Sequence, residues 1–360
     1  MFQMIKRAKI SKKESALIRL SAIVLAFLFS GLFILLLGHN PINVYISMFD
    51  GAFGSLYRLK ETITITIPLV ITSIGIMIAF KMKFWNIGGE GQILMGAFGA
   101  TIFALNMPEL PKFILLSLML VSGFISGGLW ALIPAIFKVK FGTNETIITL
   151  MLNYIAIKWI TYLQYGPMRD PSALGFPKIA NFSDNAILPS LFGIHIGWIF
   201  AVIIVITVSI FMKKSKWGYK ISVIGESFDT ARYAGININR VVLFSMFLSG
   251  GICGIAGMIE ASAVNQTLNY SISAGYGFTA IITTWLSGLM PSIIIPVSLL
   301  FGGLVKGGNF IQTAFLIPKA AAQILQSMIL FFAIGSEFFV NYKLKYKKRN
   351  YTTTNEKESV

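Results

Sequence analysis

The feature that most constrains this chain is the recurrence of apolar stretches of about 18 residues or more along its whole length. A helix of that length crosses about 30 Å of hydrocarbon with its backbone hydrogen bonds satisfied internally. With 55% hydrophobic and 12% charged residues, the 360-residue chain cannot present a polar surface to water as a soluble globular protein. The sequence therefore predicts an all-α, polytopic integral membrane protein.

Ten segments are apolar enough to serve as spans, and an even number places both chain ends on one side of the membrane. They cover residues 20–38, 62–80, 93–107, 112–137, 146–164, 195–212, 241–263, 276–290, 292–308 and 320–340. In this order, 22 of the 30 Lys and Arg residues fall in inside segments, and 8 fall outside or near outer ends. Lys and Arg accumulate on the cytoplasmic side of membrane proteins. We therefore expect both ends in the cytoplasm and a plasma-membrane location.

The basic N-terminal segment, residues 1–19, has two interpretations. It carries six basic side chains and precedes an apolar run, as a secretory signal peptide does. However, the charged region is long, no small-x-small cleavage motif precedes His39, and many more spans follow. These features favour an uncleaved first helix.

Between and beyond the spans, three stretches have a distinct composition. The transmembrane domain covers residues 20–340 and includes an external loop at 165–194, whose four prolines resist regular structure. The largest internal loop covers residues 213–240. We expect residues 341–360 to form a basic cytoplasmic tail that is disordered from Asn350 onward.

Several kinds of chemistry are missing from the sequence. Without a G-x-x-x-x-G-K-[ST] motif the chain has no Walker phosphate cradle, so any ATP hydrolysis must occur on another subunit. The single Cys253 excludes an intramolecular disulfide, and neither His39 nor His195 has a second His or Cys at metal spacing. Paired carboxylates at catalytic spacing are also absent. From these absences we expect neither an enzyme nor a bound cofactor. The basic residues form short blocks without interleaved aromatics, so we also expect no nucleic-acid partner.

A glycine-rich polar stretch, residues 84–97, opens directly into an apolar helix and reads FWNIGGEGQILMGA. Broken backbone before a helix N-terminus offers free N–H groups and a positive dipole end, and such breaks mark binding sites in transporters. A cytoplasmic turn in which Glu90 satisfies the helix start is an equally good interpretation. The first interpretation places Trp85, Asn86, Glu90 and Gln92 along a substrate pathway.

A second polar stretch, residues 141–154, reads FGTNETIITLMLNY. Either Asn144 or Thr143 can cap the helix that follows, with Glu145 in the first turn. Further along, Asn153 is a carboxamide deep in a span, where it must find a partner helix or a solute. We therefore add Asn144, Glu145, Asn153 and Tyr154 to the candidate pathway residues.

The internal loop contains a helix-compatible run, residues 226–235, which mixes charged with aromatic side chains. A short amphipathic helix of this kind fits a groove on a soluble partner. A helix lying in the lipid interface is the alternative interpretation.

The seventh span contains the sequence SGGICGIAG, in which Gly250 and Gly254 share one helix face. Glycines at this spacing let helices approach closely. Glu260 and Lys158 are ionisable groups within or near the lipid boundary, where a functional role is one interpretation and snorkelling toward the outer interface is the other.

Four of these motifs occur in order: NIGGEGQILMGA, GTNETIITLMLNYIA, IGESFDTARYAGIN and SGGICGIAG. Together they resemble the permease subunits of bacterial ABC importers of the simple-sugar and nucleoside type. The chain is most similar to the longer of the two permeases that work with a basic-membrane-protein-type lipoprotein. The resemblance covers roughly residues 15–340, and GYGFTA at residues 275–280 also fits. The family's usual basic or small residues after that motif are replaced here by Thr283–Ser287.

The resemblance implies a translocation pathway between two permease subunits in the bacterial plasma membrane. ATP and Mg would be used by a separate cytoplasmic ATPase, and an extracytoplasmic lipoprotein would deliver the solute. The second permease would be a different chain. The segment that couples to the ATPase would include Glu226, Asp229, Ala231, Arg232 and Gly235.

A cavity with few charges suits a neutral nucleoside, and it suits a simple sugar nearly as well. A carrier driven by ions through Glu260 or Lys158 is a further alternative, whereas an intramembrane lipid enzyme lacks the acids it would need.

Overall fold

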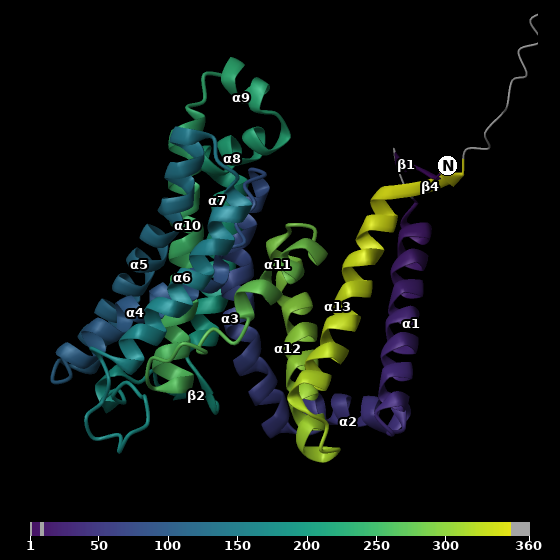
Figure 1. Ribbon diagram of the computed structural model, residues 1–360. Helices are drawn as coiled ribbons and strands as arrows, with labels where there is room; N and C mark the ends of the chain where they lie inside the picture. Colours follow the sequence, from purple (N-terminus) through teal and green to yellow (C-terminus); the bar gives the residue numbers. More distant parts are fainter. Residues whose placement is uncertain (1, 8–10, 347–360) are drawn as a thin grey trace, which may run out of the picture. The chain divides into compact units, whose positions relative to one another are not determined.

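The computed structural model describes residues 2–7 and 11–346, and nearly all of them are helical (Figure 1). Among these residues, eight helices are long and apolar enough to cross a membrane. The prediction of a polytopic helical membrane protein is confirmed. The tail that we expect to be disordered from Asn350 lies outside the described residues.

The chain divides into two compact units, and the first contains residues up to 44 and from 318 onward. Its long helices are α1 (Lys12–Leu36), which begins at a capping box formed by Ser11 and Glu14, and α13 (Lys319–Asn341), which packs along α1. Strand β1 (Phe2–Lys6) pairs antiparallel with β4 (Tyr342–Tyr346). The two ends of the described chain therefore lie side by side, in agreement with an even number of crossings.

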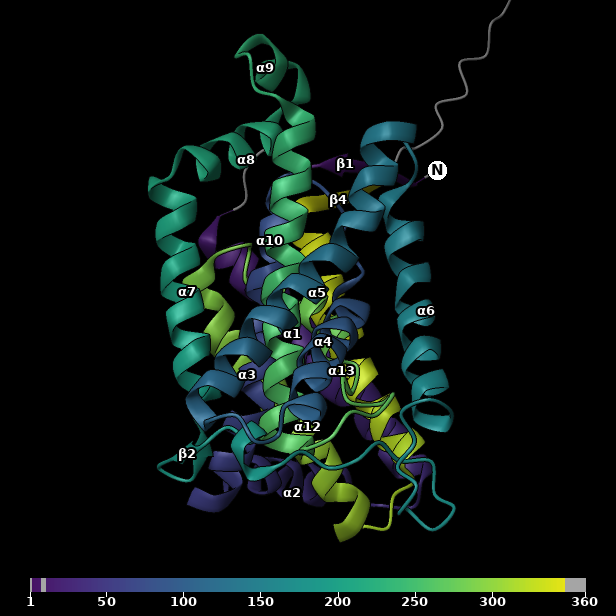
Figure 2. The ribbon, with the colours of Figure 1, turned by 90° about the vertical axis from the view of Figure 1, so that its left-hand side faces the viewer.

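The second unit covers residues 45–317, and helix α2 (Pro41–Phe53) runs from the first unit into it. Its further elements are α3 (Leu56–Lys81), α4 (Gly89–Asn106), α5 (Lys112–Phe141), α6 (Glu145–Tyr165), the 3-10 turn η1 (Asp184–Ala186), strands β2 (Ser190–Leu191) and β3 (Ile194–His195), α7 (Gly197–Lys214), α8 (Lys216–Glu226), α9 (Phe228–Tyr233), α10 (Ile238–Ile259), the π-helical turn η2 (Glu260–Asn265), α11 (Tyr276–Leu286) and α12 (Pro291–Ala314). Within this unit, α8 and α9 lie at one end and the β2–β3 hairpin at the other (Figure 1). Helices α6 and α7 flank α10 on opposite sides (Figure 2).

Helix α10 is the centre of the second unit and packs against α4, α5 and α3. Glycines make this close contact possible. A β-carbon on Gly257 would lie 1.9 Å from the Ile93 carbonyl oxygen of α4, and one on Gly254 would lie 2.2 Å from the Gly123 carbonyl oxygen of α5. The predicted packing role of the Gly250–Gly254 face is confirmed, since Gly250 likewise touches Gly127 of α5.

Two expected spans differ from the helices that form. Helix α4 begins four residues before the expected 93–107 segment, and its first turn is polar, so it is not among the eight apolar helices. Helix α11, expected to span over 276–290, has 11 residues and is about 16 Å long, too short to cross the hydrocarbon alone. It is preceded by the mostly irregular stretch 266–275, and Gly288 and Leu289 take positive φ values of 60° and 58° just after it. The expected span at 93–107 is therefore one continuous helix, whereas the expected span at 276–290 is broken after Leu286.

The internal loop expected at 213–240 contains α8 and α9, and α9 lies within the run 226–235 that the sequence marks as helix-compatible. Ser227 caps α9, because its side chain accepts a hydrogen bond from the Thr230 N–H at 3.2 Å. The external stretch 39–61, expected to be a connection, contains α2.

The glycine contacts of α10 give a direct test of the packing. We expect Gly257→Ala to lower the free energy of unfolding by about 1–3 kcal/mol, because the new methyl group meets backbone atoms that cannot move aside. Gly335→Ala in α13 is the matched control, since nothing lies within 4 Å of a β-carbon there, and it should be neutral or stabilise by about 0.5–1 kcal/mol. Thermal denaturation in detergent measures both effects. Equal stability of the two variants would contradict the packing.

Candidate functional site

Glu90 joins the starts of two helices. It lies in the first turn of α4 and is 4% exposed. Its Oε1 accepts a hydrogen bond from the Gly275 N–H at 2.9 Å, and its Oε2 accepts one from the Gly277 N–H at 2.7 Å, both at the start of α11. A carboxylate at a helix N-terminus satisfies free N–H groups and faces the positive end of the helix dipole. The starts of α4 and α11 therefore meet at one carboxylate.

Neither helix has a cap of its own. The N-cap residues are Gly88 for α4 and Gly275 for α11, and neither has a side chain that could accept a hydrogen bond. Gly277 is also required by space, because a β-carbon there would lie 2.2 Å from the Glu90 backbone nitrogen. Glu90 thus supplies from α4 the cap that α11 lacks. Both carboxylate oxygens are engaged within the chain, and the role of Glu90 toward a solute stays a prediction.

Asn86 and Gln92 form a buried amide pair at the irregular segment 82–88 between α3 and α4, which we call the break. The Asn86 Nδ2 donates to Gln92 Oε1 at 3.2 Å and to the Ser249 Oγ of α10 at 3.1 Å. The Gln92 Nε2 donates back to Asn86 Oδ1 at 3.0 Å. Each of these three side chains is at most 1% exposed. The pair therefore ties the irregular segment before α4 to the central helix.

Asn153 holds the same segment from α6. Its Nδ2 donates to the Ile87 carbonyl oxygen at 2.9 Å, and its Oδ1 accepts from the Gly91 N–H at 2.9 Å. One turn earlier, the Thr149 Oγ1 accepts from the Ile87 N–H at 3.3 Å. The sequence predicts that this deep carboxamide finds a partner, and the partner is the backbone at the break.

Trp85 and Tyr154 differ from the amides because they remain exposed, by 45% and 58%. Trp85 stacks on Trp285 of α11, with ring centroids 5.3 Å apart and an interplanar angle of 25°. The ring of Phe80 in α3 packs beside both indoles, with centroid distances of 5.6 Å to Trp85 and 5.7 Å to Trp285. Trp285 was not among the residues expected from the sequence, although it lies within 283–287, where the chain departs from the pattern of the resembled family. That departure from the family pattern is the sequence feature that could have drawn attention to Trp285.

Asn144 and Glu145 lie apart from the amide network, at the start of α6. The Asn144 Oδ1 accepts from the Thr146 N–H at 3.0 Å, so of the two predicted caps Asn144 is the one that forms. Glu145 forms an ion pair with the Lys138 ammonium of α5 at 2.8 Å. The eight expected pathway residues thus form three sets: the joint at Glu90 with its amides, the exposed aromatics, and this helix start.

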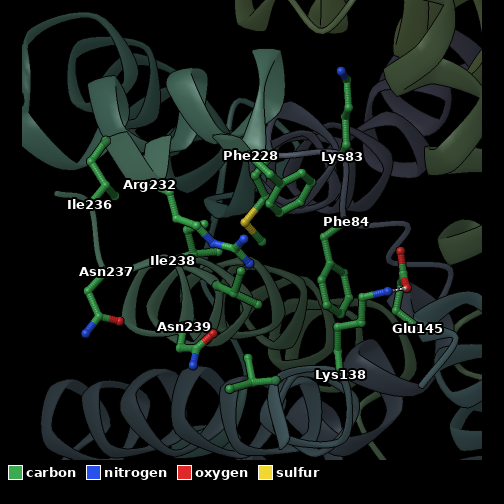
Figure 3. A pocket seen from close by; sticks show the side chains of 13 residues that line it. Lys83, Phe84, Lys138, Glu145, Phe228, Arg232, Ile236, Asn237, Ile238 and Asn239 are labelled. Atoms are coloured by element: carbon green, nitrogen blue, oxygen red, sulfur yellow. Dashed lines mark ion pairs between the residues drawn. The ribbon is translucent and has the colours of Figure 1, made fainter. Parts of the chain in front are cut away.

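A cavity of about 490 Å³ lies between α9 and the ends of α3, α5 and α6 (Figure 3). It is lined by Met82, Lys83, Phe84, Lys138, Val139, Glu145, Phe228, Arg232, Ile236, Asn237, Ile238, Asn239 and Val242. Figure 3 shows the Arg232 guanidinium pointing into it. In the part of the chain that the structure describes, no carboxylate pairs with Arg232.

The expected coupling residues divide by burial. Ala231 is fully buried and packs in the hydrophobic core, and its carbonyl oxygen accepts from the Ile236 N–H at 3.0 Å just after α9. Glu226, Asp229, Arg232 and Gly235 are exposed. The segment therefore presents its charged side chains outward while one small residue holds it to the unit.

The two ionisable groups near the lipid boundary have different surroundings. Glu260 is 3% exposed within η2, and the Asn265 Nδ2 donates to its backbone oxygen at 3.3 Å. Snorkelling does not account for a side chain buried in this way. Lys158 is exposed on α6, where snorkelling is possible.

His195 in β3 is buried, and neither of its ring nitrogens has a hydrogen-bond partner within residues 2–7 and 11–346. Burial lowers the pKa of His195 to about 4, so the imidazole is neutral at physiological pH. Among the described residues, no cluster of three His, Cys, Asp or Glu side chains could hold a metal ion. His195 packs in its loop.

A short, interrupted helix inside a helical membrane unit, such as α11, is a feature of transport proteins. The chain belongs to the permease family described as the permease component of the branched-chain amino acid transport system, which matches residues 58–334. It is a multi-pass permease of an ABC transporter in the plasma membrane.

Three relatives align along most of their length. The chain is 32% identical to the glucose ABC transporter permease protein TsgB13 of Haloferax volcanii, over 89% of this chain and 88% of the relative. It is 30% identical to the nucleoside ABC transporter permease protein NupB of Lactococcus lactis, over 90% and 92%. It is 28% identical to the guanosine ABC transporter permease protein NupP of Bacillus subtilis, over 95% and 100%. This membership decides between an importer subunit and an ion-driven carrier in favour of the importer.

The joint at Glu90 predicts the effect of a single isosteric change. Glu90→Gln places an amide NH2 opposite one of two backbone N–H donors, so we expect a loss of about 1.5–3 kcal/mol in the free energy of unfolding. Thermal denaturation in detergent measures it. Glu109→Gln, at an exposed acid in the α4–α5 connection, is the control and should change nothing. The joint is refuted if Glu90→Gln unfolds at the wild-type temperature.

Proposed function

We propose that this chain and a second, different permease chain form the translocation pathway of an importer for nucleosides. The observation that carries this proposal is the alignment, over nine-tenths of the chain or more, with permeases named for nucleosides and guanosine. The candidate site agrees with a neutral solute, because its side chains are mostly amides, hydroxyls and aromatic rings.

Stacking on Trp85 and Trp285 supports a solute with a flat aromatic ring. The two indoles are 45% and 40% exposed and come from two segments that the Glu90 joint holds together. Stacking of a base on an aromatic side chain contributes about 1–3 kcal/mol. We therefore assign Trp85, Trp285 and Tyr154 to contact with the solute. Asn86, Gln92 and Asn153, whose polar atoms are engaged, keep the break in shape.

A simple sugar is the second candidate, and a specific observation favours it. The relative at 32% identity is named as a glucose permease. Sugars also bind to aromatic faces and amides, so the candidate site suits them as well.

Energy for transport would come from a partner. The chain has no Walker motif, and we propose that a cytoplasmic ATPase, which uses ATP and Mg, docks on α8 and α9. Glu226, Asp229, Arg232 and Gly235 would contact it, and the buried Ala231 would transmit the movement of α9. Closure of the ATPase would then tip the spans between outward and inward openings. An extracytoplasmic lipoprotein would supply the solute on the opposite side.

Transport by the assembled complex in vesicles tests this function. We expect Arg232→Ala to reduce ATP-driven uptake at least tenfold while the ATPase still hydrolyses ATP, because the contact that couples the two is lost. Lys214→Ala, at an exposed cation outside α9, is the matched control and should transport normally. Wild-type uptake by the Arg232 variant would count against docking at α9. Uptake that stops with a protonophore but persists without ATP would overturn the importer itself.

A substitution in the aromatic pair separates the two solute classes. Trp285→Ala should raise the KM for nucleoside uptake about tenfold, the equivalent of about 1.4 kcal/mol of lost stacking. Trp285→Phe keeps an aromatic face and should restore most of the affinity. Competition by unlabelled nucleoside or glucose identifies the solute. An unchanged KM in Trp285→Ala would remove the stacking assignment, and competition by glucose alone would favour the sugar.

A further inference from the structure

An apolar cleft of about 310 Å³ lies between α3, α7, the β2–β3 hairpin and α12. It is lined by Ile63, Thr66, Ile67, Val70, Leu191, Phe192, Ile194, Trp198, Ala201, Val202 and Ile295. Apart from the Thr66 side chain, whose hydroxyl donates to the Thr62 carbonyl oxygen at 2.8 Å, the lining side chains are aliphatic or aromatic. The lining therefore suits an apolar chain better than a polar solute.

The cleft extends along one face of α3. Lys60, Ile63, Ile67 and Val70 recur at spacings of three and four residues, so they lie on the same face of the helix. Ten residues separate Lys60 from Val70, a rise of about 15 Å. That is half of the about 30 Å of hydrocarbon in a bilayer. With the N-terminus in the cytoplasm, α3 begins on the outer side, so Lys60 lies near its external end and the face that lines the cleft extends toward the bilayer midplane.

The Lys60 ammonium lies next to the hairpin turn whose neighbouring residues line the cleft. A β-carbon on Gly193, in the turn of the hairpin beside Phe192, would lie 2.8 Å from the Lys60 Nζ. The two other cations nearby are paired, Arg58 with Asp50 and Lys306 with Glu61. No carboxylate pairs with Lys60 in the described part of the chain. A half-buried cation without a counter-ion thus stands above an apolar cleft of leaflet depth.

We propose that this cleft binds a phospholipid of the outer leaflet, with one acyl chain along α3 and the phosphate on Lys60. The apolar lining matches the acyl chain, and the ammonium matches the phosphate. The length from Lys60 to Val70 matches one leaflet. Bound there, the lipid would hold the exposed Phe192 and the hairpin against α3 and α7.

Native mass spectrometry of the purified chain, titrated with phosphatidylglycerol, tests this site. We expect one tightly retained lipid in the wild type. Lys60→Gln should weaken retention at least tenfold by removing the phosphate partner, and Ala201→Phe should do so by filling the cleft. Lys112→Gln, at an exposed lysine at the start of α5, is the control and should retain lipid normally. The same acyl chains as diacylglycerol, without phosphate, should bind about as weakly to the wild type as phosphatidylglycerol does to the Lys60 variant.

Three results would overturn the proposal. One is full lipid retention in Lys60→Gln, a surface change that leaves the packing intact. Another is a copurified protein chain, a second copy included, whose crosslinks fall on Phe192 and Trp198. Protection of Lys60 from amine acetylation by inorganic phosphate as strongly as by phosphatidylglycerol would show a phosphate site and contradict the lipid. None of these measurements requires transport, so their outcome is independent of the function proposed above.

Discussion

The architecture of the second unit depends on how the backbone N–H groups at the start of α11 are satisfied. Within a membrane, an unpaired N–H costs several kcal/mol because no water can replace the missing acceptor. The N-cap of α11 is a glycine, so the acceptor must come from elsewhere, and Glu90 provides it from the start of α4. A carboxylate buried without a basic partner would itself be costly. Here two helix N-termini and two N–H donors compensate the charge.

The other polar groups of the site follow from this joint. The segment before α4 forms only short-range backbone hydrogen bonds, such as Asn86 N–H to the Phe84 oxygen at 2.9 Å. Asn86, Gln92 and Asn153 add side-chain hydrogen bonds that hold it, as side chains do where irregular backbone occurs at membrane depth. Gly257 and Gly277 allow the backbones to approach closely enough for these short side chains to reach. The polar atoms of these residues are occupied by hydrogen bonds that hold the break. Trp85 and Trp285 therefore remain as exposed groups beside it. The solute assignment rests on that division of roles.

Features that depend on local sequence could be predicted, because hydropathy, capping and glycine spacing act within one helix or between obvious faces. The long spans, the Asn144 cap, the close face of Gly250 and Gly254, and a helix within 226–235 belong to this group. The resemblance to permeases of ABC importers, carried by four short motifs, also agrees with the family that the chain belongs to.

The partners across the fold could not be predicted. Glu90 and Gly275 are 185 positions apart, and nothing in either motif indicates the other. The shortness of α11 is hidden because the apolar composition continues past Leu286, while the break is set by positive φ values at Gly288 and Leu289. The Trp85–Trp285 stack is equally a product of tertiary packing.

Hydrogen exchange of the backbone amides at the start of α11 tests the central claim most directly. If Glu90 caps α11, the Gly275 and Gly277 amides should exchange slowly in the wild-type protein. They should exchange at least tenfold faster when the carboxylate is removed in Glu90→Ala, with little change at the Asn144-capped start of α6. Rapid exchange of both amides in the wild type, or no difference between the two proteins, would contradict the account.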